Sequence, residues 1–300
     1  MRKNKAATAI VHITEVNTFF FHAFVTIVLL LMSAGTKAQP YLDIINLKYT
    51  NSPNTGFIHQ NKNDVQIQYF SLGTNLPVQF KNKKDALIFS PFFETWSSKI
   101  KNDNRQNYYS AALPVSINKT IPYTKWGIVL TGIVRMNDSS INKKTKVQVG
   151  GAFIIRNVRN EHLTWKLGMY INNELFGLFV IPLAGIDWKI NDRNILFGIL
   201  PANLTYEHKI NDRFYYGANF RTFTNSYVKT NEYWRIDENQ LGLYLDTYLN
   251  RSFVLNMEAG HSLFRKIRTG VKGVSKYEGN VNDNFYFKIS FAYRVRFVKK

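Results

Sequence analysis

The feature that most constrains the fold of this chain is an alternation of apolar and polar side chains with a period of two residues. The last run is the clearest, because every odd-numbered position from Phe285 to Phe297 is apolar, whereas the even-numbered positions include lysine, serine and arginine. Two residues is the repeat of a β-strand. The seven apolar residues lie in a run of 13 residues, which is about 40 Å long at roughly 3.3 Å per residue. In a strand tilted by about 45°, this stripe is long enough to cross the apolar band, about 25 Å tall, of a membrane-spanning β-barrel.

The same alternation recurs along the chain, for example in residues 126–136, 163–171, 241–249 and 253–260. Clusters of Asn, Asp, Lys, Ser and Gly separate these runs, and such clusters are typical of turns. After the N-terminal region, no segment reaches the 18 consecutive apolar residues typical of a spanning helix. The sequence therefore predicts an all-β fold, an antiparallel transmembrane β-barrel whose apolar side chains face lipid and whose polar side chains line the lumen.

The N-terminal region has the features of a secretory signal peptide. Three basic residues occur within the first five positions, an apolar run spans residues 19–32, and small residues suit cleavage after Ala38. The apolar run is shorter than the roughly 20 residues that a spanning helix needs. We predict a cleaved signal peptide over residues 1–38 and one barrel domain over residues 39–300. An uncleaved membrane anchor is the alternative.

An internal echo helps to count the strands. The segment Lys189-Ile190-Asn191-Asp192-Arg193 recurs at residues 209–213. If both copies are turns at the same rim, an even number of strands lies between them, and residues 201–203 form a tight turn at the opposite rim. This count gives about 14 strands with both ends of the barrel domain at one rim. Bacterial barrels have even strand numbers, and 12 strands is the alternative.

Turn lengths and tryptophans add two expectations. Short turns are expected at the periplasmic rim and longer loops at the outer rim, as in known barrels. Tryptophans near strand ends are expected to anchor the barrel at the membrane interfaces. The expected outer loops are 51–64, 97–106, 137–145, 225–237 and 266–283, and the tryptophans are Trp96, Trp126, Trp165, Trp188 and Trp234.

The chain is strongly basic. Without residues 1–38 it keeps 35 Lys and Arg against 19 Asp and Glu, a net charge of +16. A nucleic-acid partner is not expected, because the chain is predicted to be exported and its bases are dispersed among apolar strands. Outer-membrane lipid and anionic small solutes are the expected partners, and barrel-assembly machinery is expected to insert the chain.

Charged residues on the polar faces of the strands are the candidate lumen-lining residues. The simpler interpretation is a network of carboxylates and bases that fills the interior. The functional interpretation is a charged constriction that selects solutes and favours anions. The candidates are Lys166, Asp187, Lys189, Glu207, Lys209, Arg221, Asp246, Glu258, Lys288, Arg294 and Arg296.

No catalytic, metal or cofactor site is predicted. The chain has no cysteine and no clustered histidines, so the usual ligand sets for a metal are missing. His261-Ser262 is the single adjacent His–Ser pair after residue 38. Neighbouring residues of a strand point to opposite faces, so these two cannot form a catalytic pair with each other. His261 is expected on the lipid-facing side.

One stretch resembles a known family. It comprises residues 186–192, which include an Asn-Asp turn, and residues 196–207, which contain Leu-Pro-Ala-Asn-Leu-Thr-Tyr. This stretch resembles a family of bacterial outer-membrane β-barrel proteins with a domain of unknown function. The resemblance implies an outer-membrane barrel fold over most of the chain, and it supplies no catalytic residues.

Three functional hypotheses follow for a barrel in the outer membrane of a Gram-negative-type cell. The leading one is a non-enzymatic barrel that forms a small pore or solute pathway, with no cofactor. The second is a lipid-modifying outer-membrane enzyme. The third is a structural or adhesive barrel that works through its outer loops, notably 51–64 and 266–283.

Overall fold

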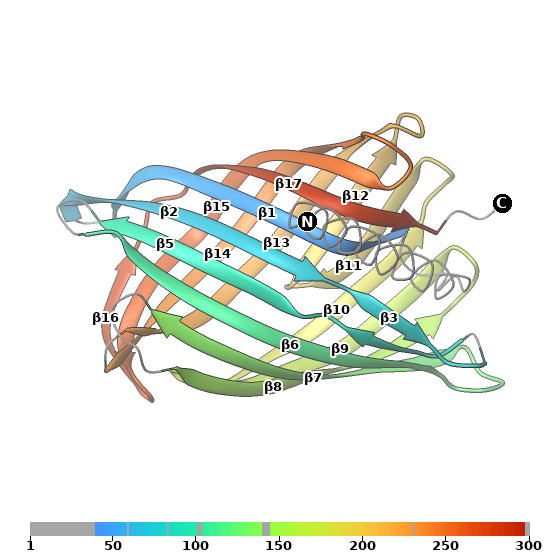
Figure 1. The fold of residues 1–300 in the computed structure, drawn as a ribbon, viewed down its shortest axis with the longest axis horizontal. Helices are drawn as coiled ribbons and strands as arrows, with labels where there is room; N and C mark the ends of the chain where they lie inside the picture. The colour runs from blue at the N-terminus through green and yellow to red at the C-terminus, as the bar shows by residue number, and fades with distance from the viewer. Residues whose placement is uncertain are drawn as a thin grey trace, which may run out of the picture.

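The chain forms a barrel of antiparallel β-strands (Figure 1). The computed structural model describes residues 40–58, 60–82, 84–100, 104–139, 145–229 and 231–297. The predicted signal peptide lies outside these residues and stays a prediction. Within the described ranges, no helix has the length and apolar character needed to cross a membrane.

The wall of the barrel contains 14 strands. The sheet has 17 segments, but three strands are interrupted and each contributes two of them: β2 with β3, β4 with β5, and β16 with β17. The segments are β1 (Tyr41–Phe57), β2 (Gln60–Thr74), β3 (Leu76–Gln79), β4 (Ala86–Phe89), β5 (Phe92–Ile100), β6 (Gln106–Thr120), β7 (Trp126–Ser139), β8 (Lys146–Val158), β9 (Leu163–Glu174), β10 (Gly177–Lys189), β11 (Asn194–Leu200), β12 (Asn203–Lys209), β13 (Phe214–Lys229), β14 (Glu232–Tyr248), β15 (Phe253–Val271), β16 (Val274–Asn280) and β17 (Asn284–Arg296).

The first and last strands close the barrel. β1 pairs with β17 in antiparallel register from Tyr41 opposite Arg296 to Asn51 opposite Phe287. The closure confirms the prediction of about 14 strands and excludes the alternative of 12. We call the rim that holds the start of β1 and the end of β17 the terminal rim, and the opposite rim the distal rim. The terminal rim also holds the connections β3–β4, β6–β7, β8–β9, β10–β11, β12–β13 and β14–β15.

The internal echo marks two turns at the terminal rim, as predicted. In each copy the asparagine side chain accepts backbone hydrogen bonds two and three residues later: Asn191 from Arg193 and Asn194, and Asn211 from Arg213 and Phe214. Such Asx turns allow a strand to reverse within four residues. The two strands between the copies, β11 and β12, have only seven residues each.

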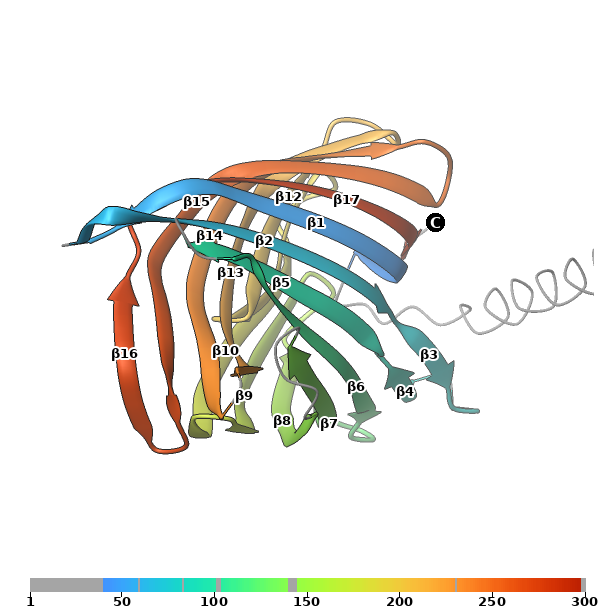
Figure 2. The ribbon, with the colours of Figure 1, turned by 60° about the vertical axis from the view of Figure 1, so that its left-hand side comes forward.

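The expectation of long outer loops was wrong for several connections. β1 extends to Phe57, β13 and β14 pair along their whole length from Lys229 opposite Glu232, and β15 pairs with β16 up to Val271 opposite Val274. Most of the expected loops 51–64, 225–237 and 266–283 are therefore strands that continue past the apolar belt. Figure 2 shows the β15–β16 hairpin at the distal rim. Of the expected loops 97–106 and 137–145, the first parts belong to β5 and β7.

The apolar side chains face outward. On β17, Phe285 and Phe287 are 63% and 61% exposed, whereas Tyr286 is fully buried and Arg294 is 5% exposed. A soluble sandwich would show the reverse, because it buries its apolar face. The outward direction of the apolar residues is therefore the direction expected for a barrel that contacts lipid.

One turn at the terminal rim is expected to respond to acid. The carboxylate of Asp85, between β3 and β4, accepts hydrogen bonds from the Thr120 amide and the Asn82 side chain, both at 2.8 Å. The Thr120 hydrogen bond, then the Asn82 hydrogen bond and the charge of Lys119 lower the pKa of Asp85 below its ordinary value of 3.8. Because the folded pKa is the lower one, this contribution to stability is complete above pH 3.8 and is lost as the pH falls through the folded pKa.

The expected result is faster hydrogen exchange of the Thr120 amide when the pH falls through that window. Comparison with Asp85→Asn, which has no ionisable group at this position, isolates the effect. The exchange rates are corrected for the intrinsic pH dependence of amide exchange. If the corrected rates then depend on pH equally in both proteins, the Asp85 carboxylate does not protect the Thr120 amide.

Candidate functional site: the barrel interior

The interior near the distal rim is filled by aromatic side chains. Tyr108 of β6 and Trp234 of β14 stack with ring centroids 4.3 Å apart and planes 7° apart. These strands lie on opposite walls, so their rings meet across the lumen. Trp96, Tyr108 and Trp234 are at most 3% exposed. We call this cluster the aromatic layer, and its buried members are Phe57, Val65, Ile67, Trp96, Tyr108, Tyr227, Trp234, Ile236, Ile267 and Val281.

The aromatic layer corrects one expectation about the tryptophans. Trp126, Trp165 and Trp188 are 41–49% exposed on the outside, in agreement with a role as interface anchors. Trp96 and Trp234 point into the barrel instead, so the prediction that they are interface anchors was wrong. In the extended strands of the distal rim, position near a strand end does not tell which face a residue occupies.

A buried ionic cluster lies next to the aromatic layer. Arg135 of β7 contacts the Glu94 carboxylate at 2.5 Å and the Ser110 hydroxyl at 2.6 Å. The Tyr227 hydroxyl of β13 donates a hydrogen bond of 2.7 Å to the same Glu94 oxygen. This cluster therefore also joins opposite walls. Removal of charges from water is expensive unless they are paired and hydrogen-bonded, and each charge here has such partners.

A second ionic cluster crosses the interior near the terminal rim. Arg294 of β17 contacts Asp43 of β1 and Asp246 of β14, both at 2.5 Å, and lies 3.6 Å from the Tyr41 ring centroid. Arg296 reaches Glu207 of β12 at 2.5 Å. These two arginines of β17 are thus paired with carboxylates from three other strands.

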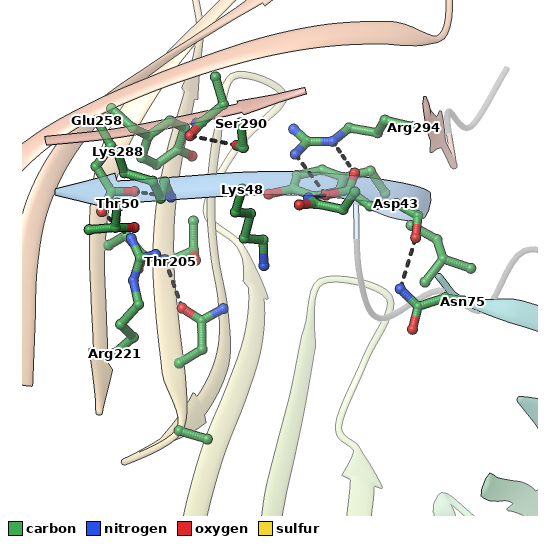
Figure 3. A pocket seen from close by; sticks show the side chains of 18 of the residues that line it. Asp43, Lys48, Thr50, Asn75, Thr205, Arg221, Glu258, Lys288, Ser290 and Arg294 are labelled. Atoms are coloured by element: carbon green, nitrogen blue, oxygen red, sulfur yellow. Dashed lines mark hydrogen bonds and ion pairs between the residues drawn. The ribbon is translucent and has the colours of Figure 1, made fainter. Parts of the chain in front are cut away.

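A polar cavity of about 430 Å³ lies inside the barrel between the walls formed by β1, β15 and β17 and by β11 to β14 (Figure 3). Its lining includes four bases and two acids, an excess of positive charge. These charged residues are Asp43, Lys48, Arg221, Glu258, Lys288 and Arg294.

Lys48 differs from the other bases of the cavity. Arg221 and Lys288 both contact Glu258, and Arg294 has its two aspartates. Lys48 extends from β1 into the cavity (Figure 3), and among the described residues no hydrogen bond or ion pair to its ammonium group is found. An unpaired charge inside a protein needs water or a counter-ion. The cavity therefore offers an anion one unsatisfied cation and several amide and hydroxyl groups.

Nine of the eleven residues predicted to line the lumen form interior ion pairs. Lys166 contacts Asp187 at 2.6 Å between β9 and β10, and the other seven belong to the clusters around Glu258, Arg294 and Arg296. Lys189 and Lys209 lie at the terminal rim, where they pair with the exposed turn residues Asp192 and Asp212. The selection of solutes by these residues stays a prediction.

The sequence analysis did not single out Lys48, Asp43, Glu94 or Arg135. Lys48 could have been found from the alternation in β1, where Ile45, Leu47 and Tyr49 are 41–42% exposed on the outside. The unpaired state of Lys48 could not, because it depends on which strands face each other across the lumen.

The candidate His–Ser pair is separated, as expected. His261 lies against the Phe285 ring with centroids 4.9 Å apart, on the outward face. The Ser262 hydroxyl is fully buried and donates a 2.7 Å hydrogen bond to Glu238 inside the barrel. In the part of the chain that the structure describes, no group of three or more His, Cys, Asp or Glu side chains could hold a metal ion.

The model of a protein family described as "Domain of unknown function (DUF6268)" matches residues 37–298. No curated protein matches the sequence.

Several solved structures are similar to this chain. An outer-membrane channel from Pseudomonas putida F1 is 8% identical, with 88% of this chain and 100% of that chain covered and a TM-score of 0.46. A deletion mutant of the TodX monoaromatic hydrocarbon channel is 7% identical, with coverages of 86% and 91% and a TM-score of 0.40. The translocator domain of the autotransporter NalP from Neisseria meningitidis is 10% identical, with coverages of 94% and 97% and a TM-score of 0.37.

Proposed function

The chain belongs to the family described as a domain of unknown function, whose model covers nearly all of the barrel, and from this family, barrel and interior we propose a narrow outer-membrane pathway for small anionic solutes. The observation that carries the proposal is the interior cavity with its excess of bases and with Lys48, whose ammonium group has no hydrogen bond or ion pair to the described residues. The pathway is non-enzymatic and needs no cofactor. It is restricted rather than wide, because the aromatic layer fills the distal end.

An outer-membrane location is supported by the closed wall and by its outward apolar belt. Hydrocarbon demands that backbone groups be hydrogen-bonded within the sheet, and the barrel meets this demand along its wall except beside residues 177–183 of β10 and 222–229 of β13. Barrel-assembly machinery would insert the chain after export. The check is a gel of membrane fractions with boiled and unboiled samples, where a folded barrel is expected to migrate differently before boiling. A freely soluble protein with no shift would contradict the location.

Passage of solutes is tested by the conductance of the purified protein in planar bilayers. A small conductance that is larger for anions than for cations is expected, because the cavity has more bases than acids. Complete absence of conductance under all voltages and salts would remove the pathway from the proposal and leave the barrel.

Replacement of Lys48 by Gln is expected to weaken the binding of a small dicarboxylate. A hydrogen bond to a charged group contributes about 1.5–3 kcal/mol, which corresponds to a roughly 10- to 100-fold rise in Kd. The measurement is calorimetric titration of the barrel in lipid nanodiscs with succinate. The matched control is Lys189→Gln, which removes a base at the terminal rim that pairs with Asp192. Equal affinities of the Lys48 and Lys189 variants would count against an anion site at Lys48.

The enzymatic alternative has little support from the interior. His261 points outward against Phe285 and is separated by the wall from Ser262. The adhesive alternative relied on long outer loops, and the segments 51–64 and 266–283 are largely strand. We therefore keep the solute pathway as the single proposed function.

A further inference from the structure

The aromatic layer narrows the distal end of the barrel along its axis, which raises the question of how a solute larger than a small ion reaches the cavity from outside. The aromatic layer joins β5 and β6 to β13 and β14, and its members are at most 5% exposed. A route along the barrel axis would have to separate Tyr108 from Trp234, which are stacked at 4.3 Å. A route through the wall avoids the layer, and the wall is incomplete at one place.

That place is above the short hairpin formed by β11 and β12. β10 pairs with β11 only over residues 184–189, and β12 pairs with β13 only as far as Arg221. In the described sheet, residues 177–183 of β10 have no partner strand on the side of β11. Residues 222–229 of β13 have no partner strand on the side of β12. Two strands are missing between these edges. The gap is therefore about 14 Å wide at its base, three strand spacings of roughly 4.8 Å.

The gap is closed again at its top. The connection between β9 and β10 reaches across to β13: the Leu175 amide donates a 3.1 Å hydrogen bond to the Ser226 hydroxyl. The Phe176 ring contacts the Tyr233 ring with centroids 6.0 Å apart, and the Phe176 carbonyl accepts a 3.1 Å hydrogen bond from the Gly273 amide. The Arg235 guanidinium of β14 also lies over the Phe176 and Phe179 rings, 4.0 and 5.8 Å from their centroids. The interruption of strand pairing is therefore bounded at its top by the β9–β10 connection and Arg235. We call it the side window, bordered by residues 177–184, 200–203 and 221–226.

The lower border of the side window is also part of the cavity. Ala202 and Asn203 are exposed, and both line the cavity together with Arg221 and Phe223. The cavity that contains Lys48 thus begins at the lower border of the window.

The border formed by β10 is apolar on both faces. Leu178 and Val180 point outward and are 72% and 46% exposed, so this edge belongs to the apolar belt. The side chains that alternate with them and point inward are Phe179, Ile181 and Leu183. A molecule that passes this edge meets hydrocarbon first and the bases Arg221 and Lys48 afterwards.

We infer that the side window admits an amphiphilic anion, a carboxylate or phosphate head with a single apolar chain, from the membrane into the cavity. The head binds beside Lys48, where a charge-assisted hydrogen bond is available. The apolar chain lies along Ile181, Leu183 and Phe223, where it is removed from water. This inference rests on the proposed function and narrows its solute class.

The absence of cysteine from the chain allows the window to be tested with single cysteines. Asn203→Cys, in nanodiscs that contain a lipid with a maleimide on its acyl chain, is expected to react within a few-fold of the rate of Leu200→Cys, which is on the outward face. Ser110→Cys, a buried interior position 2% exposed, is expected to react far more slowly. If Asn203→Cys perturbs folding, Ala202→Cys tests the same border. Reaction of both border cysteines as slow as that of Ser110→Cys would overturn the window, whatever the transport result.

The ligand class is tested by protection of the same cysteine. Dodecanoate added from water and a lysophosphatidic acid placed in the nanodisc membrane are expected to slow the labelling of Asn203→Cys several-fold, and the more effective of the two identifies the source. The Lys48→Gln background is expected to abolish this protection. Protection by neither compound would overturn the amphiphile, and equal protection in the Lys48→Gln background would overturn the head position. Succinate binding that survives a failed window experiment would leave the proposed function in place.

Discussion

Replacement of both Tyr108 and Trp234 by Ala is expected to open the distal end of the barrel and to raise its single-channel conductance several-fold. The two rings stack across the lumen at 4.3 Å and are 0% and 3% exposed, so they occupy the axis of the barrel. Trp96 still contacts the Phe223 ring of β13 after their removal, and Tyr227 keeps its hydrogen bond to Glu94, so the change widens the axis without breaking every contact across the lumen. Truncation of a buried aromatic residue also costs about 3–5 kcal/mol of stability, and the variant is expected to unfold at lower urea concentration.

Planar-bilayer recordings of the wild-type protein and the double variant test this expectation. Phe285→Ala with Phe287→Ala is the matched control, because it removes two aromatic rings that are exposed on the outside of the barrel. The control is expected to keep the wild-type conductance. If the double variant of the aromatic layer also keeps it, the layer is not the barrier along the axis, and the argument for a route through the wall loses its premise.

The alternation of side chains determined the fold wherever a strand crosses the apolar belt. In β17 the outward residues are apolar and the inward residues are polar, so the direction of every side chain follows from one run of sequence. The strand count followed from the echo at residues 189–193 and 209–213 together with the even number of strands in bacterial barrels. These two constraints predicted the short β11 and β12, which turned out to frame the side window.

Beyond the belt the alternation loses its meaning. Thr224 of β13 and Arg235 and Asp237 of β14 belong to strands, yet they are polar on the face that is apolar lower in the barrel, and Arg235 lies against the Phe176 ring. Polar residues on both faces resemble a loop in sequence, which explains why three strand extensions were expected to be loops. The inward aromatic residues Trp96 and Trp234 were assigned to the outside for the same reason.

Contacts across the lumen could not be predicted from the sequence. Lys48 and Glu258 lie on inward faces by alternation alone. The alternation does not say that Glu258 pairs with Arg221 and Lys288, whereas Lys48 has no ion-pair partner in the part of the chain that the structure describes. Which walls approach each other depends on the tilt and stagger of all 14 strands. Candidate residues were therefore predictable, whereas the cavity they form was not.

Replacement of Arg294 by Met is expected to be the most destabilising single change among the interior charges. Its guanidinium is 5% exposed and joins Asp43 of β1 to Asp246 of β14 from β17, so it spans the seam at which the barrel closes. Loss of one member of a buried ionic cluster costs about 3–5 kcal/mol, because the remaining charges stay buried without a partner. The measurement is the free energy of unfolding in urea from lipid vesicles.

Two further variants separate loss of the charge cluster from loss of packing. Lys189→Met breaks an exposed pair with Asp192 at the terminal rim and is expected to cost no more than about 1 kcal/mol. Asp43→Asn and Asp246→Asn added to Arg294→Met are expected to recover most of the lost stability, because they neutralise the two carboxylates that the arginine had compensated. If the triple variant is no more stable than Arg294→Met, the arginine acts through packing against the Tyr41 ring, 3.6 Å away, and the seam is held by shape rather than by charge.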